Sequence, residues 1–167
     1  KSKIEKNNIF DYKTFKELEN LISEFSAGDI TVFNDDIQKD VKSGDIKIFF
    51  NNDKWLVVIP NNKEMSCKYG IGTNSCTANK EHNAFDTYKD APLYIFLDKS
   101  TNLKPTYQFH FRSKQFMDIK DKPIKLNEFF ENNIEVYDKF YPSIKNKLDN
   151  KESLIPSELQ YLPRSYM

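Results

Sequence analysis

The segment from Cys67 to Ala78 holds the residues of this chain that are best suited to chemistry. It reads Cys-Lys-Tyr-Gly-Ile-Gly-Thr-Asn-Ser-Cys-Thr-Ala, and it contains both cysteines and two of the four glycines. It lies between two apolar runs, Trp55–Pro60 and Leu93–Asp98, which read as strands. Loops between strands commonly carry binding and catalytic residues. A functional site is therefore expected here, although the spacing matches no motif with a settled reaction.

Cys76 is the candidate nucleophile of this segment. A thiolate at a glycine-rich turn can be activated by a neighbouring base. His110 is the better placed of the two histidines, because it lies on a predicted strand that would hold its ring. A Cys76–His110 pair would make a cysteine-dependent hydrolase or transferase, with Gln108 or a loop amide stabilising an oxyanion. The alternative is a buried, inert Cys76 and a solvated His110, since free cysteines are among the most buried residue types.

The same segment and one strand face are candidates for ligand binding. In the run 106–112, Gln108, His110 and Arg112 alternate with aromatic residues, so the polar side chains share one face. Such a face can bind an anion or a base, but it is also what any half-exposed strand presents. The residues that we expect at a ligand are Tyr69, Gly70, Gly72, Thr73, Thr77, Gln108 and Arg112.

The glycines of the segment have two possible roles. Gly70 would follow a short helix over 62–69, and Gly72 would supply a tight turn with positive φ in a crowded loop. Gly44, in a polar stretch, reads as the more exposed position. A phosphate cradle at 69–73 is the alternative, but the segment lacks the spacing of the known phosphate-binding loops.

Metal binding and disulfide formation are the other roles open to the cysteines. A zinc site would have to use Cys67, Cys76, His82 and His110, whose spacings do not give ligand pairs two to four residues apart. We therefore expect no metal and no other cofactor. With two cysteines and no visible signal peptide, free thiols in a reducing compartment are expected.

The composition excludes several classes of partner. Charged residues make up 30% of the chain and cancel to a net charge of zero, so nothing global attracts nucleic acid or an anionic membrane. No apolar stretch reaches the length that spans a bilayer. The expected partner is an unidentified protein or small molecule.

The order of the predicted elements indicates an α+β domain, with a small antiparallel sheet of four to five strands and helices packed mainly on one face. We expect a polar lead-in over 1–12, the domain over 13–150 and a C-terminal tail over 151–167. The elements predicted from periodicity and turn residues are a helix over 15–25, strands over 46–50, 55–59, 93–97 and 106–112, and a helical stripe over 126–141 that Pro142 interrupts or restarts.

Part of the chain resembles a recurrent segment of uncharacterised phage and viral proteins. The matching runs are Trp55–Pro60, Glu64–Gly70 and Gly72–Ala78, and the similarity continues to Asp118. The pattern is a W-x-V-x-x-P strand followed by YGxGTxWCT, and this chain departs from it at Ser75, where the pattern carries Trp. The resemblance implies an accessory or virion-associated protein of the host cytoplasm or the virion, with a pocket altered at Ser75.

Overall fold

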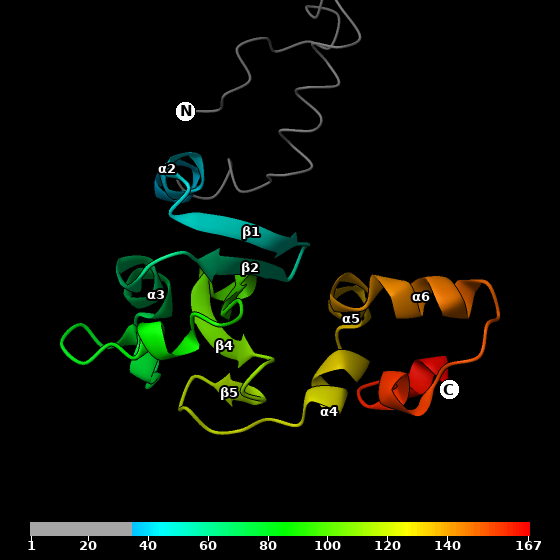
Figure 1. The fold of residues 1–167 in the computed structure, drawn as a ribbon. Coiled ribbons are helices and arrows are strands. Elements are labelled where there is room, and N and C mark those ends of the chain that lie inside the picture. Colours follow the sequence, from blue (N-terminus) through cyan, green and yellow to red (C-terminus); the bar gives the residue numbers. More distant parts are fainter. Residues whose placement is uncertain (1–34) are drawn as a thin grey trace, which may run out of the picture.

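The computed structural model describes residues 35–167, so the helix predicted over 15–25 and the lead-in over 1–12 lie outside it. The α+β class is confirmed, because helices pack on an antiparallel sheet of five strands (Figure 1). Each strand pairs with the next one along the chain, in the order β1-β2-β3-β4-β5. The strands are β1 (Ile46–Asn51), β2 (Trp55–Pro60), β3 (Tyr94–Asp98), β4 (Lys104–His110) and β5 (Gln115–Asp118).

Strand β2 is buried on both of its faces because its apolar run has no polar alternation. Trp55 and Val57 point into one core, while Leu56 and Val58 point into a second core on the opposite face. The turn before β2 is fixed by the side-chain oxygen of Asn52, which accepts from the backbone N–H of Trp55 at 2.7 Å. A strand that is apolar on both faces requires a cover on each side of the sheet.

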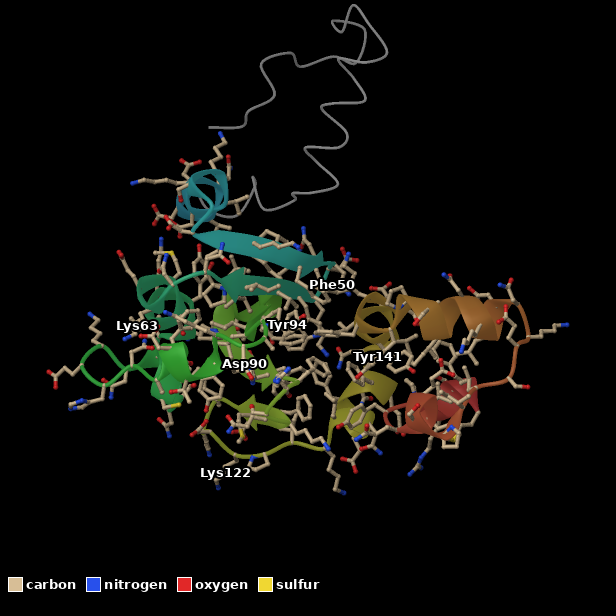
Figure 2. The ribbon with its side chains drawn as sticks, viewed as in Figure 1. Phe50, Lys63, Asp90, Tyr94, Lys122 and Tyr141 are labelled. Atoms are coloured by element: carbon tan, nitrogen blue, oxygen red, sulfur yellow. The ribbon has the colours of Figure 1, made fainter. Side chains whose placement is uncertain are left out.

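The larger core lies between the sheet and the helices that follow it in sequence (Figure 1). Tyr94 reaches from β3 toward this helical layer (Figure 2) and contacts Phe140 with ring centroids 4.8 Å apart. Phe96 and Phe109 are fully buried and pack with centroids 4.6 Å apart. The helices of this layer are α4 (Leu126–Glu131), α5 (Ile134–Phe140) and α6 (Pro142–Asp149), so Pro142 starts a new helix.

The smaller core lies on the other face of the sheet, under α2 (Asp35–Ser43) and α3 (Lys63–Gly70). Ile37 of α2 and Met65 of α3 pack there against the second set of strand side chains. Helix α3 begins at the Asn62 side chain, which accepts from the Met65 backbone N–H at 2.9 Å. This second layer adds to the predicted arrangement, in which the helices lay mainly on one face.

The segment predicted as a C-terminal tail, 151–167, packs back on α5 and α6. Leu162 is buried in the larger core, and the Tyr166 hydroxyl donates to Asp138 at 2.7 Å. Lys147 of α6 pairs with Glu158 at 2.6 Å. These contacts join the last residues of the chain to the helical layer.

Strand β4 ends at His110, two residues before the predicted end at Arg112. The chain reverses there in a tight turn, in which the Lys114 N–H donates to the Phe111 carbonyl at 3.1 Å and Lys114 has φ +53°. The turn leads into β5, which the sequence did not predict. Arg112 therefore lies in a turn and does not share the strand face of Gln108.

Two polar contacts fix the helical layers, one between a helix junction and the sheet and the other between helices α2 and α3. The indole N–H of Trp55 donates to the Asn133 side chain at 2.7 Å, at the junction of α4 and α5. On the other face, the buried Asp40 of α2 accepts from Lys68 at 2.6 Å and from the Tyr69 hydroxyl at 2.7 Å. Burial alone would raise the pKa of Asp40, but these hydrogen bonds and the charge of Lys68 outweigh it and hold the pKa below its usual value.

We expect Asn133→Ala to lower the free energy of unfolding by ~1–3 kcal/mol, because it leaves the buried Trp55 indole N–H without its acceptor. Trp55 is the single tryptophan, so urea unfolding followed by its fluorescence measures the loss. Asn146→Ala, at an exposed position of α6, is the matched control and should change stability little. Equal stabilities of the two variants would contradict the role given to Asn133.

We expect Asp40→Asn to lower stability at neutral pH by ~2 kcal/mol, since it removes a carboxylate that accepts two hydrogen bonds. The folded-state pKa of Asp40 lies below the unfolded value of about 3.9, so its stabilisation is present above about pH 4 and is lost as the pH falls through the folded-state pKa. The difference in urea midpoint between the wild type and the variant should therefore be smaller at pH 3 than at pH 7. Asp53→Asn in the exposed β1–β2 turn is the control, and a pH-independent difference for Asp40→Asn would refute the assignment.

Candidate functional site

The segment from Cys67 to Ala78 is held rigidly by hydrogen bonds to its own backbone carbonyls. The Thr77 carbonyl accepts from the Ser66 hydroxyl at 2.8 Å and from the Asn83 amide at 2.6 Å. The Cys67 thiol donates to the Ala78 carbonyl at 3.2 Å. These bonds fix the short 3-10 helix η3 (Cys76–Ala78) against α3 and place Cys76 at the surface.

The glycines of the segment differ from the prediction. Gly72 has the expected positive φ of +89°, but a Cβ there would meet nothing within 4 Å, and Gly44 is equally open at φ +77°. The expected contrast between a crowded Gly72 and a free Gly44 is therefore wrong. The crowded position is Gly70, the last residue of α3, where a Cβ would lie 2.9 Å from the Cβ of Ala78.

The loop and the polar side of β4 converge, as expected from the sequence. The Thr77 hydroxyl donates to the side-chain oxygen of Gln108 at 2.8 Å. Next to this contact lies a cavity of about 140 Å³, which we call the Cys76 pocket. It is lined by Ser75, Cys76, Tyr88, Gln108, His110, Gln115, Met117 and Asp121.

Tyr88 stands beside Cys76 in this pocket. It ends the 3-10 helix η4 (Phe85–Tyr88), and its hydroxyl donates to the side-chain oxygen of Gln115 at 2.8 Å. The Cys76 sulfur lies 3.9 Å from the Tyr88 oxygen, and because that hydroxyl hydrogen is already used, the thiol is the donor in this contact. Burial, and then the nearness of Cys76, raise the pKa of Tyr88.

His110 is a wall of the pocket and is not a partner of Cys76. Its side chain is buried, and its Nε2 lies 3.1 Å from the Tyr88 carbonyl, which can only accept, so Nε2 carries the hydrogen. Its Nδ1 accepts from the backbone N–H of Ser113 at 3.3 Å. Both ring nitrogens are therefore occupied, and no hydrogen bond joins His110 to Cys76 within residues 35–167.

Arg112 lies outside the Cys76 pocket, at the surface next to Asp90 (labelled in Figure 2). Its guanidinium contacts Asp90 at 2.9 Å, and the other Asp90 oxygen lies 3.4 Å from Nε2 of His110. Asp90 thus links the exposed turn to the buried ring. This ion pair supports the turn, and a ligand contact of Arg112 stays a prediction.

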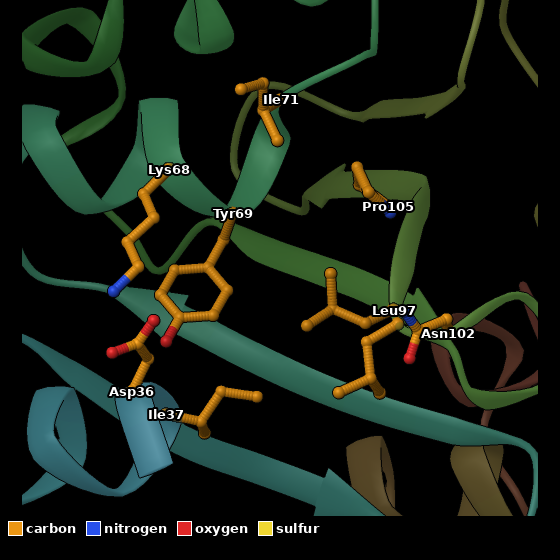
Figure 3. A pocket seen from close by; sticks show the side chains of 9 residues that line it. Asp36, Ile37, Lys68, Tyr69, Ile71, Leu97, Asn102 and Pro105 are labelled. Carbon is orange, nitrogen blue, oxygen red and sulfur yellow. The ribbon is translucent and has the colours of Figure 1, made fainter. Parts of the chain in front are cut away.

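The remaining predicted ligand residues are distributed around the loop. Tyr69 lines a different cavity of about 190 Å³, where its hydroxyl points toward α2 (Figure 3). Thr73 closes the turn by donating from its hydroxyl to the Gly70 carbonyl at 2.8 Å. The backbone N–H groups of Thr73 and Asn74 are likewise bonded within the protein, so they are not free to cradle a phosphate.

Sequence reasoning missed part of the pocket wall. Gln115 and Asp121 come from the unpredicted strand β5 and from the turn after it, whereas Ser75 was expected at a pocket through the resemblance alone. Tyr88 was likewise not among the predicted site residues. A signal for Gln115 was present, since the resemblance extended to Asp118, but its position depends on the pairing of β4 with β5, in which His110 faces Gln115.

The cysteines and histidines do not come together. Both cysteines are free, Cys67 partly buried and Cys76 exposed. His82 lies at the exposed surface, where its backbone N–H donates to Asn79 at 3.0 Å. Across residues 35–167, no three His, Cys, Asp or Glu side chains are grouped so that they could hold a metal ion.

A wider groove of about 700 Å³ flanks the other side of the loop, between α3 and residues 79–83. Of the three lysines that line it, Lys63 and Lys68 are paired with carboxylates, at 2.5 Å and 2.6 Å, and the charge of Lys80 is balanced by that of Glu64 in the same lining. The groove therefore carries little excess charge, and it adds no indication of nucleic-acid binding.

No protein-family model, curated protein or solved structure matches this chain. Among the helices of residues 35–167, none combines the length and the apolar character needed to cross a bilayer.

We expect Gly70→Ala to destabilise the protein by ~1–3 kcal/mol, because its new Cβ would overlap the Cβ of Ala78 at the closest approach of α3 and η3. The double variant Gly70→Ala/Ala78→Gly removes the overlapping atom. In a double-mutant cycle measured by urea unfolding, it should be more stable than the sum of the single changes. Strictly additive changes in stability would show that the two Cβ atoms do not clash.

Proposed function

We propose that this chain is a non-catalytic binding module of a phage or virus, and that it holds a protein partner at the Cys76 pocket and the loop around it. The observation that carries the proposal is the convergence of the loop and β4 on one pocket, through the contact of Thr77 with Gln108. The similarity to a segment of phage and viral proteins supports the origin and a place in the host cytoplasm or the virion.

The size of the pocket supports a protein partner over a cofactor. Its volume is about 140 Å³, whereas pockets for drug-sized ligands and cofactors usually measure about 300–1,000 Å³. A space of this size accepts one side chain. The exposed Ile71, with 62% of its surface accessible, lies on the same loop and offers a second, apolar contact to a partner.

A cysteine-dependent enzyme is the weaker alternative. Such an enzyme needs a base within hydrogen-bond reach of its thiol. Here the neighbour of Cys76 is the Tyr88 phenol, whose hydrogen goes to Gln115, and the imidazole of His110 is bonded on both nitrogens. The groups that would do the chemistry are thus held in structural contacts.

Selection from a displayed library of random dodecamer peptides tests the proposal. The protein used is Cys67→Ser, which keeps a donor for the Ala78 carbonyl and leaves Cys76 as the one thiol. We expect enriched peptides to bind this protein and to lose ~10-fold or more in affinity once N-ethylmaleimide fills the pocket at Cys76, since a filled pocket cannot accept a side chain.

The matched control is Cys67→Ser/Cys76→Ser, whose peptide binding N-ethylmaleimide should not change. Intact-mass spectra after binding should show both the protein and the peptide unmodified. The absence of any enriched peptide, or binding that survives the block at Cys76, would contradict the proposed surface. A covalent adduct or a cleaved peptide would favour the enzyme.

A further inference from the structure

Two side-chain amides of the Cys76 pocket have nitrogens without a hydrogen-bond partner among residues 35–167. The oxygen of Gln108 accepts from Thr77, and the oxygen of Gln115 accepts from Tyr88, each at 2.8 Å. With the oxygens used in this way, each side-chain NH₂ is turned to the other side. Neither nitrogen has a hydrogen-bond partner in residues 35–167, and neither is a buried unpartnered atom, so both are accessible to solvent at residues that line the pocket.

The orientation of both amides is set by a directed chain of hydrogen bonds. Thr77 gives its hydroxyl hydrogen to Gln108, so the hydroxyl of Ser75, 3.0 Å from the Thr77 oxygen, is the donor in that contact. Gln115 is held in the same sense by the Tyr88 phenol, and the raised pKa of that phenol keeps its hydrogen in place. The pocket therefore offers hydrogen-bond donors on this wall.

The opposite chemistry is supplied by Asp121. Its side chain lines the same pocket from the turn after β5, is exposed, and has no hydrogen-bond or ion-pair partner within residues 35–167. After burial and the nearness of Cys76, the charge of Asp121 is a further cause of the raised pKa of Tyr88. A carboxylate can only accept hydrogen bonds, so the Asp121 wall binds a donor group of the ligand and repels an anion.

We infer that the Cys76 pocket binds a terminal carboxamide, the group carried by Asn and Gln side chains of the partner. The carbonyl oxygen of the carboxamide accepts from the NH₂ groups of Gln108 and Gln115, and its own NH₂ donates to Asp121. This inference rests on the proposed function, because it names what the partner inserts. A carboxylate lacks the donor and meets the Asp121 charge, whereas an ammonium lacks the acceptor that the glutamines need.

Small-molecule titrations followed by ¹H–¹⁵N NMR test this inference without a known partner. The probes are acetamide, N,N-dimethylacetamide, which keeps the acceptor but has no donor, and acetate. We expect acetamide to shift the side-chain amide signals of Gln108 and Gln115 but not that of Gln160, which lies in the C-terminal segment. Acetamide should bind about fivefold more tightly than dimethylacetamide, the usual effect of one hydrogen bond, and acetate should bind most weakly.

Two substitutions test which wall of the pocket donates to the ligand and which wall accepts from it. Gln115→Glu keeps the acceptor for Tyr88 but removes the donor to the ligand, so acetamide binding should fall about fivefold or more. Asp121→Gly suits the backbone φ of +59° and removes the carboxylate, so the preference for acetamide over dimethylacetamide should disappear. The backbone spectrum of each variant shows whether the fold is retained.

The outcomes separate this inference from the proposed function. Acetate binding as tightly as acetamide, or acetamide binding that is unchanged by Gln115→Glu, would overturn the carboxamide while leaving peptide binding at Cys76 in place. Enriched peptides without a recurrent Asn or Gln would do the same. Peptide binding that ignores the block at Cys76 would instead overturn the proposed function, whatever the small probes do.

Discussion

Burial of the central strands on both faces is the constraint on which the rest of the structure depends. Side chains of β2 and β3 alternate between two cores, with Val57 facing Phe96 in one and Leu56 facing Leu97 in the other. Each face then needs its own cover, which α4–α6 provide on one side and α2 with α3 on the other. The connection from β2 to β3 must follow the second face, and this brings the loop to β4.

The site is where that two-sided burial stops. On β4, Phe109 still fills the larger core, but its neighbours Gln108 and His110 are polar and contact residues of the connection between β2 and β3. Their partners there are the Thr77 hydroxyl and the Tyr88 carbonyl, so hydrogen bonds replace apolar packing at this part of the sheet. Buried polar groups require such partners. Within residues 35–167 the side-chain nitrogens of Gln108 and Gln115 have none, so they are the donors that this wall of the pocket can offer.

Much of the fold could be predicted from the sequence, because strongly apolar runs such as Trp55–Pro60 carry their own signal. The meeting of the loop with β4 also followed from the expectation that consecutive strands are neighbours. The state of His110 could not be predicted, since its partners, the Tyr88 carbonyl and Ser113, are backbone and turn groups without a sequence signature. The same holds for Asp40, whose burial depends on a distant Lys68 and Tyr69.

The order of the strands also has a consequence for the folding kinetics. Strands β1 and β2, and likewise β3 to β5, are joined by short connections, so each group can pair at a small entropic cost. The pairing of β2 with β3 has to close the long connection over 61–93, and contacts that close long loops form slowly. The hairpin β1–β2 and the three-stranded unit β3–β5 would then form first and pair with each other afterwards. Because the Cys76 pocket uses the connection and β4–β5 together, it would be completed only in that pairing step.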